Sequence, residues 1–105
     1  MLSFKEKSAI RLTVNRMTDA IINREDLHDA ILKCDFNIPD TKNNLNEIEK
    51  LSIELVAMVS VEIARFVYAE KASVEQLDCI CEGVLSKFRF IQKQSSESDD
   101  FTFDF

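Results

Sequence analysis

The chain has 105 residues, of which 46% are hydrophobic and 30% are charged, with one glycine and one proline. This length predicts a single domain, and the apolar content is sufficient for a hydrophobic core. The scarcity of glycine and proline argues against an all-β fold with many tight turns. The net charge of −6 disfavours nucleic-acid binding and favours a protein partner, especially a basic one.

The first 24 residues differ in charge from the rest of the chain. They carry five basic and two acidic side chains, a net charge of +3, so the remaining 81 residues carry −9. The N-terminal sequence has no apolar run of signal-peptide length. Three cysteines without a secretion signal are typical of reduced thiols, so we expect a cytoplasmic protein.

The first predicted helix spans about residues 3–22. Its apolar residues recur at spacings of four, three and four, which places them on one helical face: Ile10, Val14, Met17 and Ile21. Ser3 and Glu6 have the spacing of an N-terminal capping box. A second helix is predicted over residues 24–35, after a break near Asn23, although one continuous helix to residue 35 is the alternative.

A connection over residues 35–44 contains Pro39 and several residues with capping side chains. The third predicted helix spans residues 44–71, and its segment 53–69 is apolar almost all the way around. Only Glu54, Glu62 and Arg65 interrupt this segment, within an arc of about 80°. These charges exclude a membrane span, so we expect a helix that is surrounded, either inside the monomer or across a subunit boundary.

The fourth predicted helix spans residues 73–93. Ser73 and Gln76 have capping-box spacing, and helically spaced apolar residues follow: Leu77, Ile80, Cys81, Val84, Phe88 and Ile91. Gly83, the only glycine, lies inside this helix, where it costs about 0.5–1 kcal/mol relative to alanine. We expect Gly83 to permit the close approach of another helix, such as the third.

Residue types that carry chemistry are sparse in this chain. The single histidine, His28, lies among acidic residues and is expected to be exposed. Cys79 and Cys81 point about 200° apart on a helix, so they cannot share a metal ion, and Cys81 is expected in the core. One glycine cannot build a phosphate-binding loop, and no calcium-loop pattern is present. We therefore expect no enzyme, cofactor or metal site.

The C-terminal residues 95–105 are acidic and aromatic and are predicted to form an extended tail. In an extended chain, Phe101, Phe103 and Phe105 point the same way. Burial of one such ring is worth about 1.5–3 kcal/mol, so three rings can hold a short segment in a groove. The tail supplies the predicted partner-binding residues: Asp99, Asp100, Phe101, Phe103, Asp104 and Phe105. Three interpretations of the tail remain open: it docks onto its own domain, it docks onto another copy or a different protein, or it is disordered.

These features predict an all-α fold with about four helices in a small antiparallel bundle over residues 1–94, followed by the tail. The function expected for it is the binding of another protein. An inhibitor or neutraliser that works by surface occlusion, such as an immunity protein, an antitoxin or a phage inhibitor, fits best. The alternatives are a homo-oligomeric scaffold or secretion-type chaperone, dimeric through the third helix or the tail, and a transcriptional regulator.

Overall fold

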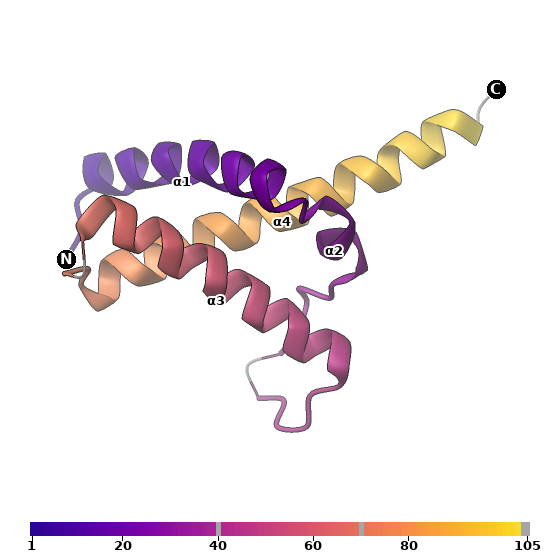
Figure 1. Ribbon diagram of the computed structural model, residues 1–105, viewed down its shortest axis with the longest axis horizontal. Helices are drawn as coiled ribbons and strands as arrows, with labels where there is room; N and C mark the ends of the chain where they lie inside the picture. Colours follow the sequence, from indigo (N-terminus) through magenta and orange to yellow (C-terminus); the bar gives the residue numbers. More distant parts are fainter. Residues whose placement is uncertain (40, 70, 104–105) are drawn as a thin grey trace.

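The computed structural model describes residues 1–39, 41–69 and 71–103, with side chains up to residue 95 in the last helix. Within these residues the fold is all-α, as predicted. The four helices are α1 (Phe4–Glu25), α2 (His28–Lys33), α3 (Glu47–Tyr68) and α4 (Val74–Phe103). In Figure 1, α3 runs opposite to α1 and α4, and the short α2 lies beside the middle of α4.

The central helix is α4, which packs against α1, α2 and α3. Its buried residues Ile80, Val84 and Phe88 form the middle of the core. The prediction that the third helix is surrounded within the monomer is therefore wrong. One face of α3 is buried, but Ile53, Met58 and Val61 are about half exposed on its other sides. An apolar sequence all around a helix does not say whether its own chain covers it.

Capping residues explain where three of the helices begin. Ser3 accepts a hydrogen bond from the backbone of Glu6, and Ser73 and Gln76 form the predicted capping box. The third helix begins later than predicted, because Asn46 and Glu49 form a capping box of their own that excludes residues 44 and 45.

The first helix continues past the predicted break near Asn23 and ends at Glu25. Its C-cap, Asp26, has a left-handed backbone with φ of 54°. Aspartate tolerates this conformation better than most residues, which allows the chain to turn directly into α2. The chain therefore forms two helices here, as predicted, and the alternative of one continuous helix to residue 35 is wrong.

The last helix also continues further than predicted. The backbone of residues 95–103 is helical, whereas an extended tail was expected from residue 95. No glycine or proline interrupts this segment, and adding a residue to an existing helix avoids the cost of nucleation. Figure 1 shows this part of α4 extending beyond the other helices. Residues 104 and 105 lie outside the described residues.

Side chains of α4 hold the end of α2 in place. Gln92 donates hydrogen bonds of 2.8 Å to the carbonyl oxygens of Ile31 and Cys34, and Arg89 donates one of 2.7 Å to the carbonyl of Phe36. The ring of Phe36 lies 5.4 Å from that of Phe88. A helix of six residues cannot persist alone, so these tertiary contacts define α2.

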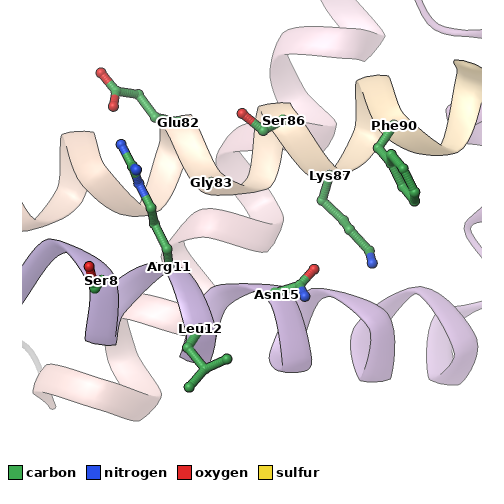
Figure 2. Close-up of a pocket in the computed structure, with 9 residues that line it drawn as sticks. All are labelled: Ser8, Arg11, Leu12, Asn15, Glu82, Gly83, Ser86, Lys87 and Phe90. Atoms are coloured by element: carbon green, nitrogen blue, oxygen red, sulfur yellow. The ribbon is translucent and has the colours of Figure 1, made fainter.

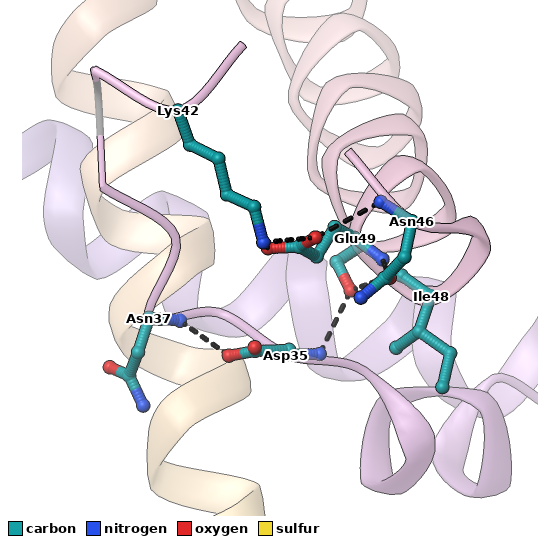
Figure 3. Close-up of polar contacts among 7 residues, drawn as sticks. Asp35, Asn37, Lys42, Asn46, Ile48 and Glu49 are labelled. Atoms are coloured by element: carbon teal, nitrogen blue, oxygen red, sulfur yellow. Dashed lines mark hydrogen bonds and ion pairs between the residues drawn. The ribbon is translucent and has the colours of Figure 1, made fainter. Parts of the chain in front are cut away.

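The connection between α2 and α3 is held by polar contacts at the first turn of α3 (Figure 3). Glu49 is only 3% exposed, and both of its carboxylate oxygens lie 2.7 Å from Nζ of Lys42. The backbone N–H of Asn46 donates a further hydrogen bond to this carboxylate. Nearby, the hydroxyl of Ser52 accepts a hydrogen bond from the backbone of Asp35. These contacts attach the long connection to α3.

Among the described residues, no helix combines the length and the apolar character that crossing a membrane requires.

The environment of Glu49 predicts acid sensitivity. The hydrogen bond from the Asn46 backbone, followed by the contact with Lys42, lowers the pKa of Glu49. Its contribution to stability is therefore complete above the pKa of an unfolded glutamate, about 4.3, and is lost as the pH falls through the lowered folded pKa. We expect E49Q to reduce the acid dependence of the melting temperature between about pH 6 and pH 3. The control E47Q, which alters an exposed carboxylate in the same turn, should keep the wild-type dependence; equal curves for E49Q and wild type would contradict the assignment.

Two buried hydroxyls, those of Thr18 and Ser60, have no hydrogen-bond partner among the described residues. Thr18 is fully buried in α1, so its hydroxyl is desolvated without compensation. We expect T18V, which preserves the shape of the side chain, to raise the free energy of unfolding by about 1 kcal/mol in urea titrations. The control T13V, at a partly exposed position of the same helix, should change the free energy of unfolding much less. A T18V variant that is less stable than the wild type would show that the hydroxyl of Thr18 has a hydrogen-bond partner, which would contradict the prediction.

Candidate functional site

An open groove of about 820 Å³ runs between α1 and α4. Figure 2 shows its two walls, with side chains of α4 on one side and side chains of α1 on the other. Four residues of α1 and five of α4 line it: Ser8, Arg11, Leu12, Asn15, Glu82, Gly83, Ser86, Lys87 and Phe90. On each helix these residues share one face, so the groove follows the helix axes.

Close packing at Gly83 sets the floor of the groove. A β-carbon at this position would lie 2.9 Å from Cγ1 of Val14, which is too close for an ordinary contact. The expectation that Gly83 permits close helix approach is therefore confirmed, with α1 as the neighbour instead of the third helix. Val14 is 1% exposed, so the contact belongs to the core directly beneath the open groove.

The charged groups of the groove come from both walls. Lys87 lies 3.1 Å from the carboxylate of Asp19 on α1, and its ammonium lies 5.7 Å from the ring centroid of Phe90. Figure 2 shows Arg11 reaching from α1 towards α4. Within the described part of the chain, neither Arg11 nor Glu82 forms an ion pair. One cation and one carboxylate therefore remain available to a bound molecule.

Apolar contact area in the groove comes from Leu12 and Phe90, which are 56% and 50% exposed. Aromatic and aliphatic side chains beside unpaired charges are typical of surfaces that bind a segment of another protein. The groove hydroxyls belong to Ser8 and Ser86, and the only histidine, His28, lies on another helix, α2. This arrangement suits recognition of a ligand.

The end of α4 that contains the described part of the predicted tail extends away from the start of α1 (Figure 1). Asp99, Asp100, Phe101 and Phe103 belong to the helical end of α4, where an extended chain had been assumed. Their side chains, and all of Asp104 and Phe105, lie outside the described residues. The role of the tail in binding therefore stays a prediction.

The cysteines and the histidine occupy separate places. Cys34 and Cys79 are buried, whereas Cys81, which was predicted to be in the core, is only partly buried. Because α4 contacts three helices, its buried surface is wider than the single stripe read from the sequence and includes Cys79. His28 is exposed, as expected. The described residues include no group of three or more histidine, cysteine or acidic side chains placed to hold a metal ion.

The groove itself was not predicted, although the sequence contains two signals for it. Gly83 indicated a close helix contact, and the residues flanking a close contact line a shallow groove. On α1, the positions Ser8, Arg11, Leu12 and Asn15 recur at helical spacing beside the buried stripe. The sequence did not indicate that α1 is the neighbour of Gly83, because the spacing of residues within one helix does not say which helix it contacts.

Comparisons with known proteins add no assignment: no family model matches this chain, and no curated protein or solved structure matches it.

Close packing at Gly83 predicts that this glycine cannot be replaced without cost. Alanine favours a helix by about 0.5–1 kcal/mol, but its β-carbon would press on Val14 in a packed core. We expect G83A to lower the free energy of unfolding by about 1–3 kcal/mol in urea titrations.

A double-mutant cycle tests the cause. In a V14A background the added methyl group has room, so G83A should cost less there than in the wild type. A stabilised G83A variant, or equal costs in both backgrounds, would contradict the proposed contact.

Proposed function

We propose that this protein is a binding module that takes up a segment of another protein in the groove between α1 and α4. The observation that carries the proposal is the combination of exposed Leu12 and Phe90 with the unpaired charges of Arg11 and Glu82 in one groove. A groove between two helices fits an amphipathic helix, whose apolar residues recur at positions three and four apart.

The charge of the molecule favours a basic partner. The positive and negative charges of the groove nearly cancel, because Lys87 is paired with Asp19 and Arg11 lies in the same groove as Glu82. Long-range attraction is therefore governed by the net charge of −6. An acidic module steers a basic protein towards itself, and the groove residues then select the segment that binds.

The proposed effect on the partner is occlusion. A bound module of this size covers the surface of its partner around the docked segment and keeps other molecules away from it. An inhibitor or neutraliser of this kind requires no reactive group of its own, in agreement with the residue types in the groove. The acidic and aromatic end of α4 is proposed to add contacts outside the groove, through residues such as Asp100 and Phe101.

Charge substitutions at the two exposed apolar positions test the groove. We expect L12E and F90E each to weaken partner binding by about tenfold or more, because they place a carboxylate in the apolar contact. The partner would be captured from host extract with the immobilised full-length protein, and binding of the purified partner would then be measured by titration calorimetry.

The matched control is V74E, which alters an equally apolar and more exposed residue at the start of α4. This variant should bind like the wild type, and circular dichroism should show unchanged helix content for all three. Loss of binding in V74E, or full binding in L12E and F90E, would contradict the proposal. Removal of residues 95–105 measures the separate contribution of the tail.

A further inference from the structure

The outward side of α3 is apolar at its centre and has no partner among the described residues. Leu51, Met58 and Val61 are each 45–47% exposed there. A second open groove, of about 570 Å³, runs along this side. It is separate from the groove between α1 and α4, since α3 contributes no residue to that one.

The exposed residues follow the spacing of a coiled-coil contact. Five positions alternate at intervals of three and four, and we call them the α3 seam: Leu51, Glu54, Met58, Val61 and Arg65. Such spacing aligns side chains along one line of a helix that another helix can cover. Met58 and Val61 therefore form the apolar middle of the seam. The negative charge of Glu54 lies on one side of this pair, and the positive charge of Arg65 lies on the other.

The two charges of the seam cannot neutralise each other within one chain. Glu54 and Arg65 are eleven residues apart, which is about 16 Å along a helix. Among the described residues, no ion pair involves either of them. Both side chains are exposed, so each is available to an oppositely charged group of another molecule at a matching distance.

A second copy of the same helix supplies that match when it runs antiparallel. With the two-fold axis between Val59 and Ser60, Glu54 of one copy lies opposite Arg65 of the other, and Met58 lies opposite Val61. The symmetry repeats both pairings, giving two apolar layers between two ion pairs. A parallel arrangement would instead place like charges beside each other at Glu54 and at Arg65, which is unfavourable.

We propose that α3 is the interface of an antiparallel homodimer, in which the α3 seams of two copies pack against each other. This proposal does not depend on the function of the groove between α1 and α4. The α3 seam shares no residue with that groove, so contact through the seam leaves the residues of the groove available in both copies. A dimer would therefore present two identical binding surfaces.

A charge-exchange experiment tests both the interface and its direction. Sedimentation velocity of the full-length protein over a range of concentrations gives the dimer Kd for wild type, E54R, R65E and the double variant E54R/R65E. Each single variant places like charges together twice, so we expect its dimer Kd to rise by about tenfold or more. The double variant restores both pairs with reversed sign, and we expect its Kd to return to within about threefold of the wild type.

Further variants test the apolar centre. M58D should shift the protein towards the monomer, whereas L12D, at a more exposed apolar position on α1, should leave the dimer intact. Circular dichroism and the melting temperature confirm folding for each variant. A wild-type protein that stays monomeric at every concentration would overturn the proposal. A dimer unaffected by E54R, R65E and M58D, or one lost only on removal of residues 95–105, would overturn it as well.

Discussion

The contact between Val14 of α1 and the backbone of α4 at Gly83 is the constraint on which the rest of the structure depends. It sets the separation of these two helices, so that their outward residues form an open groove above a closed core. It also leaves the remaining sides of α4 free to pack against α2 and α3. The groove and the core are thus two sides of the same helix pair.

Local signals in the sequence predicted the elements of the fold. The Ser73 and Gln76 capping box, the buried stripe of α1 and the four helices could all be read from spacing, because these features depend on neighbours within one turn. Their arrangement could not be read in the same way. The apolar residues of α3 predicted a helix surrounded either inside the monomer or across a subunit boundary. Within the monomer α4 occupies the centre instead, because packing depends on which helices meet.

The two proposed binding surfaces of this small bundle differ in how they are built. The groove between α1 and α4 is lined by side chains of two helices, so its shape depends on tertiary packing. The α3 seam lies on one helix and has a pattern that is complementary to itself. With separate surfaces, the proposed dimerisation and the proposed binding of a partner could change independently, since a substitution on one helix face leaves the other face unaltered.

The only glycine of the chain lies at a helix crossing, so the helix ends have none. Asp26 and Ala69 close α1 and α3 with left-handed backbones, at φ of 54° and 56°, where a β-carbon costs about 1 kcal/mol. The strain is greater at Ala69 than at Asp26, because aspartate tolerates this conformation better than alanine. We therefore expect local opening to begin at the junction after α3 before the crossing of α1 and α4 opens.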